Sequence, residues 1–385
     1  MKQHELHFIL LANYLPDRQE SMARYALNLR DSLHREQVEA EIWYPTVFFG
    51  AFSKDTHAGV GKWLTYLDKY LLFPAQLWLR MKLNSDYARD LTFFHICDHS
   101  NSPYLRLLPA NRTGITCHDV LAIRGAAGFK DTHCEASATG KILQRWILMH
   151  LSRAKILSAV SQFTMKQLLE VSKNRQPADA RWRVIPNSFN ACFFPMERAA
   201  SGVLIAKCGI REGASFLLTV GSAEPRKNRK ILLDMAHCLK GQWEGLICYA
   251  GQRLDPSLIS YAEKLGLKNR VLNIAEPDHQ TLVALYSACT AFVFPSFAEG
   301  FGWPLIEAQA CGAPVLASNR APMPEITNGA ALYADPYAPA DFAGAFLKLL
   351  EEEKRERLIA LGFENCKRFE RGLVVREFID LYLEG

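Results

Sequence analysis

The sequence predicts an α/β protein built from two doubly wound domains, and three observations support that class. Short apolar runs alternate with amphipathic segments almost from end to end, which is typical of parallel strands with helices on both faces of the sheet. The chain has 385 residues, enough for two domains that each bury a core. Between the two alternating halves, residues 186–213 contain prolines and glycines and show no strand pattern, so we interpret this segment as a linker with a short helix.

The expected elements follow from the period of the apolar residues. Strands are expected at 6–11, 38–43, 91–96, 114–117, 155–160 and 183–185, and in the second half at 215–220, 245–250, 271–274, 291–294, 314–317 and 331–333. Helical patterns fall between them, notably at 21–35, 141–153 and 164–173, and again at 351–385.

These elements predict the domain organisation. We expect an N-terminal domain at 1–190, a linker at 191–213, a second domain at 214–360, and a helical segment at 361–385 that packs back toward the N-terminal domain. Ligands of doubly wound sheets bind at the carboxyl ends of the strands. The cleft between the two domains is therefore the expected binding site.

Composition excludes several classes of protein. With 49% hydrophobic and 22% charged residues, the chain is not disordered, collagenous or a coiled coil. Its ten cysteines show no metal-ligand spacing, which indicates free and mostly buried thiols in a reducing compartment, with no bound metal. The first apolar run is short and meets Asp17 and Arg18, so we interpret it as a strand and not a signal peptide. We expect a cytoplasmic protein.

Charge is unevenly distributed along the chain. Residues 1–195 hold 24 Lys and Arg against 17 Asp and Glu, whereas residues 196–385 hold 21 against 23. The basic half is expected to face something anionic, and nothing in the sequence points to nucleic acid. Within it, residues 63–82 combine tryptophans and leucines with basic side chains. A helix packed on the sheet is the commoner explanation, and a peripheral contact with the inner membrane face is the alternative.

The strongest motif lies at 292–312, FVFPSFAEGFGWPLIEAQACG. A buried strand ends at Pro295, a loop carries Glu299, and Pro304 sits where a first helical turn accepts proline. Glycines before a helix N-terminus expose backbone N–H groups to an anion such as phosphate. Glu299 and Glu307 flank this helix start, where each can accept hydrogen bonds from a hydroxyl group; the alternative is a glycine turn with solvated glutamates.

A second motif, TVGSAEPRKN at 219–228, follows another expected strand. It places Arg226 and Lys227 at the carboxyl edge of the second sheet, with Asn228 as the N-cap of the next helix. A guanidinium and an ammonium group there suit a diphosphate, although two surface cations are often only solvated.

Together these motifs resemble the donor-binding domain of family-four retaining glycosyltransferases, which have the GT-B fold of two Rossmann-like domains facing a cleft. The resemblance rests on the Glu299 and Glu307 pair within EGFGWPLIEA, on VGSAEPRKN before it and on PEITNGAALYADP after it. It covers most of residues 215–340 and extends more loosely to the N-terminal half through TCHD at 116–119, SAVS at 158–161 and VIPN at 184–187.

The resemblance implies a role for each motif residue. Arg226 and Lys227 would bind the diphosphate and stabilise it as it leaves, Glu299 would hold hydroxyls of the donor sugar, and His118 would contact that sugar from the N-terminal domain. Cations at the leaving group lower the barrier most, because negative charge develops there. Further donor contacts are implied at Glu307 for the ribose, at Gly300, Phe301, Gly302, Gly221 and Ser222 for the sugar or phosphates, and at Pro277 for the base.

The chain also departs from the family pattern. The family often has Gly-Arg where this chain has Gly221-Ser222, and the glycine-rich turn after the first strand is replaced by NYLPDRQESM at 13–22. Within that segment, residues 18–21 either read the acceptor or cap the first helix, with Asp17 or Ser21 as the cap. Asp98-His99-Ser100-Asn101 ends another strand and is either an acceptor contact or a polar turn.

The leading hypothesis is a retaining hexosyltransferase that uses a nucleotide diphosphate sugar, with mannose or glucose as the first candidates, and a glycan or lipid-linked acceptor in surface polysaccharide synthesis. The chain has no Asp-x-Asp pair, so no metal and no cofactor besides the donor substrate is expected. A sugar-nucleotide epimerase and a non-catalytic sugar-nucleotide or glycan-binding protein on the same scaffold are the alternatives. No strand is followed by G-x-G-x-x-G, which disfavours a dehydrogenase.

Overall fold

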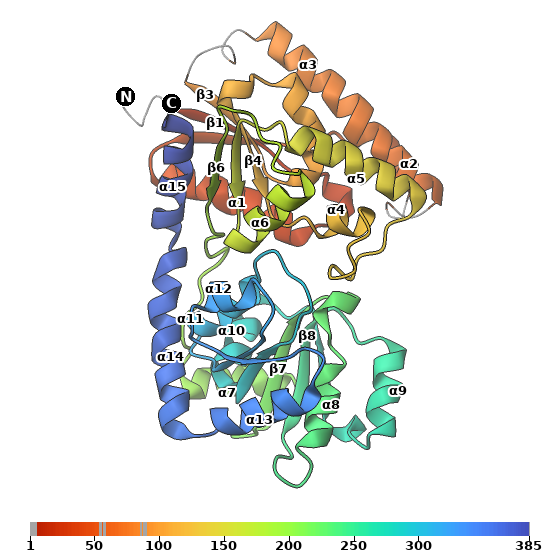
Figure 1. Ribbon diagram of the computed structural model, residues 1–385. Helices are drawn as coiled ribbons and strands as arrows, with labels where there is room; N and C mark the ends of the chain where they lie inside the picture. The colour runs from red at the N-terminus through yellow and green to blue at the C-terminus, as the bar shows by residue number, and fades with distance from the viewer. Residues whose placement is uncertain (1–5, 54–55, 57–58, 85–86, 88–90, 385) are drawn as a thin grey trace. The chain divides into compact units, whose positions relative to one another are not determined.

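The computed structural model describes residues 6–53, 56, 59–84, 87 and 91–384 (Figure 1). The chain forms two compact units. Unit 1 consists of Met1–Gly128, Glu135–Asn190 and Arg371–Gly385, and unit 2 of Phe129–Cys134 and Ala191–Glu370. Residues 191–213, expected to be a linker, lie in unit 2, and of the expected terminal segment only the part from Arg371 onward lies in unit 1.

Unit 1 is built on a parallel sheet in the order β2-β1-β3-β4-β5-β6. The strands are β1 His7–Leu11, β2 Glu39–Trp43, β3 Thr92–Ile96, β4 Thr113–Cys117, β5 Ile156–Ala159 and β6 Arg181–Val184. Each lies within two residues of its predicted bounds. Side chains of β1, β3 and β4 are buried on both faces, which explains their continuous apolar runs.

Helices cover both faces of this sheet. They are α1 Glu20–Arg35, α2 Gly59–Leu67, α3 Phe73–Leu83, α4 Leu121–Ala126, α5 Ala138–Leu151, α6 Gln162–Val171 and α15 Arg371–Leu383. On one face, α1 and α15 bury Leu33 and Phe378 against Phe8. On the other, α3 and α5 bury Phe73 and Ile147 against the opposite side chains of the same strands. The result is a three-layer unit of helices, sheet and helices.

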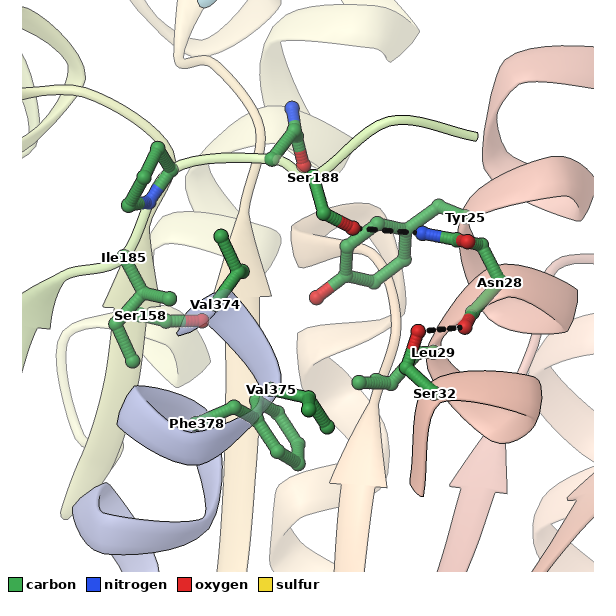
Figure 2. Close-up of a pocket in the computed structure, with 12 residues that line it drawn as sticks. Tyr25, Asn28, Leu29, Ser32, Ser158, Ile185, Ser188, Val374, Val375 and Phe378 are labelled. Carbon is green, nitrogen blue, oxygen red and sulfur yellow. Dashed lines mark hydrogen bonds between the residues drawn. The ribbon is translucent and has the colours of Figure 1, made fainter. Parts of the chain in front are cut away.

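Helix α15 lies in unit 1 although it is the last element of the chain. Figure 2 shows Val374, Val375 and Phe378 of α15 beside Leu29 of α1. Asn28 Nδ2 donates a hydrogen bond to Ser188 Oγ at 2.8 Å in the same region (Figure 2). The Arg371 guanidinium donates to the Phe189 carbonyl at 2.8 Å. Both apolar and polar contacts therefore fix the end of the chain to unit 1.

Unit 2 has a second parallel sheet, in the order β12-β11-β10-β7-β8-β9. Its strands are β7 Phe216–Gly221, β8 Leu246–Gly251, β9 Val271–Ala275, β10 Ala291–Phe294, β11 Val315–Ser318 and β12 Leu332–Ala334. All six lie within one residue of the predicted bounds. Counted from β7, this order is 6-5-4-1-2-3, the doubly wound order of dinucleotide-binding sheets, which reverses direction between β7 and β10.

The helices of unit 2 again cover both faces. They are α7 Arg198–Lys207, α8 Ile231–Cys238, α9 Pro256–Lys264, α10 His279–Ala288, α11 Trp303–Ala310, α12 Met323–Thr327, α13 Pro339–Leu349 and α14 Glu352–Cys366. Leu232 of α8 and Phe346 of α13 pack on one face with Leu217 of β7. Tyr286 of α10 packs edge-on against Phe292 of β10 on the other.

The structure also tests the expectation for the cysteines. All ten cysteines are free, but Cys192 and Cys238 are exposed, so burial is less general than composition predicted. None of the described helices combines the length and the apolar character that crossing a bilayer requires.

Gly251 is required where β7 and β8 end side by side. It has a φ of +109°, and a Cβ there would lie 2.8 Å from the Gly221 carbonyl oxygen. We expect Gly251→Ala to lower the free energy of unfolding by about 2–4 kcal/mol, because both strain and a backbone clash result. Gly202→Ala in α7 is the control, since no atom lies within 4 Å of the added Cβ, and it should raise stability by about 0.5–1 kcal/mol. Denaturant unfolding measures both, and equal effects would contradict the backbone argument.

Candidate active site

The two motif loops of unit 2 meet where the strand order reverses. The loop after β7 contains the 3-10 turn Pro225–Lys227, and the loop after β10 leads into α11. Because β7 and β10 pair directly, in parallel, their carboxyl ends place both loops at one edge of the sheet. In doubly wound sheets this reversal point is where ligands bind.

At this edge Arg226, Lys227 and Glu299 form an ion cluster. Arg226 Nη1 lies 2.7 Å from Glu299 Oε2, and Lys227 Nζ lies 2.7 Å from Glu299 Oε1. The Glu299 side chain is 7% exposed, whereas those of Arg226 and Lys227 are 19% and 16% exposed. The carboxylate is therefore inside, and the two cations form the more accessible layer above it.

The cluster keeps Glu299 ionised. Burial by itself raises the pKa of the Glu299 carboxyl, but Lys227 and Arg226 outweigh it, and the pKa lies below its ordinary value of 4.5. An unpaired carboxylate at this depth would instead tend to take up a proton. The sequence predicted these residues separately, as phosphate ligands and a sugar ligand, and the structure brings them into direct contact.

Two further residues hold the cluster in place, Glu224, which the sequence reasoning missed, and Asn228, to which it gave another role. Glu224 Oε2 lies 2.6 Å from Arg226 Nε, so Arg226 is held between two carboxylates. Asn228 Nδ2 donates to the carbonyls of Pro295 and Pro336, at 3.2 and 2.8 Å. Asn228 was expected to be a helix N-cap, which is wrong: it lies in the left-handed region with a φ of +51° and ties the two loops together. Asparagine tolerates the left-handed conformation better than most residues, which is the signal for such a turn.

The N-terminus of α11 adds backbone donors to this edge. Gly302 precedes the helix with a φ of +99°, a conformation that favours glycine. Pro304 lies in the first turn, as predicted. The Phe301 side chain is buried against Phe369, so any contact from Phe301 to a ligand comes from its backbone.

Glu307 lies inside α11 and is also buried. Tyr286 donates its hydroxyl hydrogen to Glu307 Oε2 at 3.0 Å. Burial raises the pKa of Tyr286, and Glu307 raises it further, so the phenol stays protonated and remains a donor. A carboxylate oriented in this way can accept hydrogen bonds from a diol such as ribose.

The remaining predicted donor contacts also lie at the carboxyl ends of strands. Gly221 and Ser222 line a small pocket with Lys227, Phe294 and Ser296. Pro277 follows β9, where the amide of Glu276 donates to the Gly251 carbonyl at 2.9 Å. Their roles toward a ligand stay predictions.

His118 follows β4 in unit 1 and is buried. Its Nε2 lies 2.9 Å from the Cys97 carbonyl oxygen, and because a carbonyl only accepts, Nε2 carries the hydrogen. Burial lowers the pKa of His118 below 6.5 despite the neighbouring Asp98. The ring is neutral at pH 7, and its contact with a donor sugar stays a prediction.

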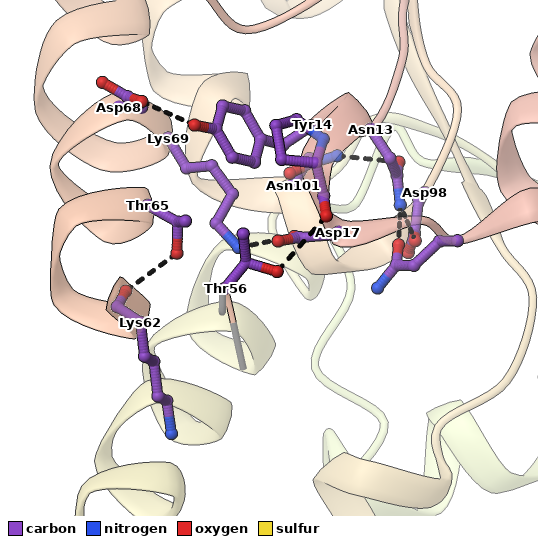
Figure 3. A network of polar contacts seen from close by, with 12 residues as sticks. Asn13, Tyr14, Asp17, Thr56, Lys62, Thr65, Asp68, Lys69, Asp98 and Asn101 are labelled. Carbon is purple, nitrogen blue, oxygen red and sulfur yellow. Dashed lines mark hydrogen bonds and ion pairs between the residues drawn. The ribbon is translucent and has the colours of Figure 1, made fainter. Parts of the chain in front are cut away.

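The polar residues that follow β1 and β3 form one network in unit 1. Asn13 Nδ2 donates to Asp98 Oδ2 at 2.6 Å and also to Gln19, and Asn101 Nδ2 donates to Asn13 Oδ1 at 3.0 Å (Figure 3). Asp98 is thus more than a turn residue. The predicted capping of α1 is wrong, because the first turn has no side-chain cap and Asp17 pairs with Lys69.

Across the part of the chain that the structure describes, no three His, Cys, Asp or Glu side chains converge as a metal ion would require.

Comparison with known proteins shows what the chain is similar to. Residues 203–364 match the family Glycosyl transferases group 1. The chain is similar to O-antigen chain mannosyltransferase B of Escherichia coli, with 30% identity over 227 residues that make up 57% of this chain and 58% of that protein. The chain spans less than two thirds of the length of such curated relatives.

Solved structures share the whole fold. Sucrose-phosphate synthase from Thermosynechococcus elongatus is 18% identical, with a TM-score of 0.73 over 98% of both chains. Anabaena Alr3699/HepE, solved in complex with UDP and glucose, is 16% identical, with a TM-score of 0.71 over 99% of this chain and 100% of that one. The fold is therefore that of the GT-B glycosyltransferases. The match to Glycosyl transferases group 1 lies within unit 2.

The ion cluster makes a prediction about stability and pH. Glu299→Gln leaves two cations without their shared anion, so we expect a loss of about 2–4 kcal/mol in the free energy of unfolding at pH 7. Since the folded pKa of Glu299 is below 4.5, its contribution is complete above that pH and is lost as the pH falls through the folded pKa.

The difference in the free energy of unfolding between wild type and Glu299→Gln should therefore become smaller as the pH falls. Denaturant unfolding from pH 7 to about pH 3 measures this difference. Glu351→Gln, which removes an exposed pair with Lys354, is the control and should change stability much less. A difference that stays constant with pH would refute the ionised cluster.

Proposed function

We propose that the protein is a retaining glycosyltransferase that moves a hexose from a nucleotide diphosphate sugar to a hydroxyl group of a glycan or lipid-linked acceptor in surface polysaccharide synthesis. The observation that carries this proposal is the pair of cations at the carboxyl end of β7, held on a buried glutamate beside a helix N-terminus. The match of residues 203–364 to Glycosyl transferases group 1 and the similarity to an O-antigen mannosyltransferase support the same class.

In the proposed reaction, the bond from the anomeric carbon to the diphosphate breaks while the acceptor oxygen bonds to that carbon. The leaving phosphate oxygen takes the acceptor proton. Arg226 and Lys227 stabilise the negative charge that grows on the diphosphate, which is where electrostatic stabilisation lowers the barrier most. Their ammonium and guanidinium groups need no reorientation, because Glu299 and Glu224 already hold them.

Glu299 serves two purposes in this scheme. Each of its oxygens accepts a hydrogen bond from one cation, at 2.7 Å. Each oxygen retains a second lone pair, which suits a hydroxyl of the donor sugar. The same carboxylate thus fixes the distance between the sugar and the groups that bind the diphosphate.

We include in the proposal that the two cations take the place of a metal ion and that no cofactor besides the donor is needed. Mannose and glucose are the first donor sugars to test. HepE was solved with UDP and glucose, and the curated relative is a mannosyltransferase, so UDP-glucose and GDP-mannose head the panel. We also propose a peripheral contact of unit 1 with the membrane.

Arg226→Ala and Lys227→Ala should each reduce transfer by about 2–4 kcal/mol of transition-state stabilisation, with a smaller loss of donor affinity. Lys230→Ala is the matched control, because Lys230 is exposed, three residues away, and pairs only loosely with Asp234 at 3.9 Å. Single-turnover transfer and donor calorimetry separate the two effects. Unchanged turnover in both variants would refute the leaving-group assignment.

The donor panel tests the function itself. We expect calorimetric binding of one nucleotide and its sugar conjugate with a chelator present, and a product whose anomeric configuration matches the donor. Epimerisation without an acceptor would favour a sugar-nucleotide epimerase, and saturable binding with no turnover would favour a non-catalytic binding protein.

Glu307→Gln separates ligand binding from packing. The amide oxygen can still accept the Tyr286 hydroxyl hydrogen bond, so the melting temperature should change little. The loss of the carboxylate should weaken donor binding roughly tenfold, the value of a hydrogen bond to a charged group. Isothermal titration calorimetry with the nucleotide measures this affinity. A lower melting temperature with unchanged affinity would show that Glu307 has a structural role only.

A further inference from the structure

An apolar stripe runs along the solvent side of α2, the π-helical turn Asp68–Leu72 and α3. Its members recur every three or four residues and are all exposed: Val60, Trp63, Leu67, Leu71, Ala75, Trp78, Leu79 and Leu83. The exposed fraction reaches 56% for Trp63 and 53% for Trp78. A surface helix of a globular protein normally turns its apolar side inward, so this stripe calls for a partner.

The inner side of the same segment is held by polar groups. Asp68 is fully buried and accepts a hydrogen bond from the Tyr14 hydroxyl at 2.6 Å (Figure 3). It also accepts from the amides of Phe49 and Gly50 at 2.9 Å and of Phe48 at 3.0 Å. Lys69 Nζ pairs with Asp17 at 2.7 Å (Figure 3). Rolling the helix to bury the stripe would pull a carboxylate out of four donors, so the outward orientation is built into the fold.

The same contacts fix a second apolar group. The amides that Asp68 binds belong to the 3-10 turn Phe49–Phe52 and to Phe48 just before it. Phe48 is 55% and Phe52 78% exposed. Two more aromatic side chains are thereby held on a turn that is bonded directly to this helical segment.

The exposed charged side chains of residues 59–84 are all basic. Within residues 59–84, all of which the structure describes, Asp68 is the one acidic residue and it is buried. Arg80 and Lys82 are exposed near the end of α3, and Lys62 is partly exposed beside Trp63. Residues 59–84 thus combine tryptophans and leucines with Lys and Arg and have no exposed acidic residue. This composition suits the interface of a bilayer, where an anionic headgroup layer covers an apolar acyl layer.

We infer that this stripe is an interfacial surface that binds an anionic phospholipid bilayer. Trp63 and Trp78 would lie at the headgroup level, the leucines would enter the acyl boundary, and Lys82 would meet lipid phosphates. The Arg80 guanidinium stacks on the ring of Trp43, 4.6 Å from its centroid. The inference extends the proposed function and rests on it for its purpose, because a lipid-linked acceptor lies at such a surface. The argument for binding itself depends on unit 1 alone.

Vesicle co-sedimentation of the full chain tests the surface without any donor. We expect retention on vesicles of phosphatidylglycerol and phosphatidylethanolamine, weaker retention on phosphatidylcholine alone, and loss with added salt. The triple variant Trp63→Gln, Leu71→Gln, Trp78→Gln should bind at least about tenfold more weakly. Val203→Gln with Leu361→Gln, which replaces exposed apolar residues of α7 and α14, is the control and should bind as wild type.

A second measurement avoids variants that fold poorly. Brominated lipids should quench the tryptophan fluorescence of the wild type more than that of Trp63→Phe, Trp78→Phe, which keeps the stripe apolar. Equal quenching, or equal vesicle binding by the triple variant, would overturn the inference. If the wild type does not bind vesicles but forms a dimer, and the triple variant is a monomer, the stripe would instead be the contact with a second copy of the chain. Vesicle binding without nucleotide binding would refute the proposed function but would still support the inference that the stripe binds a bilayer.

Discussion

The candidate active site depends on one buried carboxylate between two cations, and that contact exists because β7 and β10 are neighbours in the sheet. Residues 226 and 299 are far apart in the chain, yet parallel strands deliver the loops that follow them to the same edge. Glu299 is buried deeply enough to require partners, and Arg226 and Lys227 lie near enough to the surface to meet a ligand. The cost of burying the carboxylate is thereby offset by the same cations that a diphosphate would use.

The sheet of unit 1 reverses direction between β1 and β3, and its edge carries different chemistry. There Asn13 and Asp98 are joined by a 2.6 Å hydrogen bond, and His118 at the end of β4 donates to the carbonyl of Cys97, the residue before Asp98. Amides, a carboxylate and an imidazole accept and donate hydrogen bonds without a surplus of positive charge, which suits hydroxyl groups. The edge of unit 1 therefore offers hydrogen-bonding groups, whereas the edge of unit 2 offers two cations.

The helical segment from α2 to α3 shows how a buried polar group can decide what a surface presents. Asp68 and Lys69 face inward, where both have partners. The residues of the apolar stripe lie on the opposite side of the same segment and face solvent. In most surface helices apolar burial orients the helix and polar groups follow. Here the buried polar contacts of Asp68 and Lys69 orient the segment together with the buried Phe73 and Leu77, and a second set of apolar residues is left exposed on the opposite side.

The sequence by itself determined the twelve strands, the presence of two doubly wound units and the motif residues of the site, because strand period and glycine or proline positions are local properties. It could not show that Glu299 binds both Arg226 and Lys227, that Asn228 ties two loops together instead of capping a helix, or that Asp68 orients the apolar stripe. Those contacts join residues between 18 and 108 positions apart. Only the tertiary structure decided them, since burial and the order of the strands select which side chains become partners.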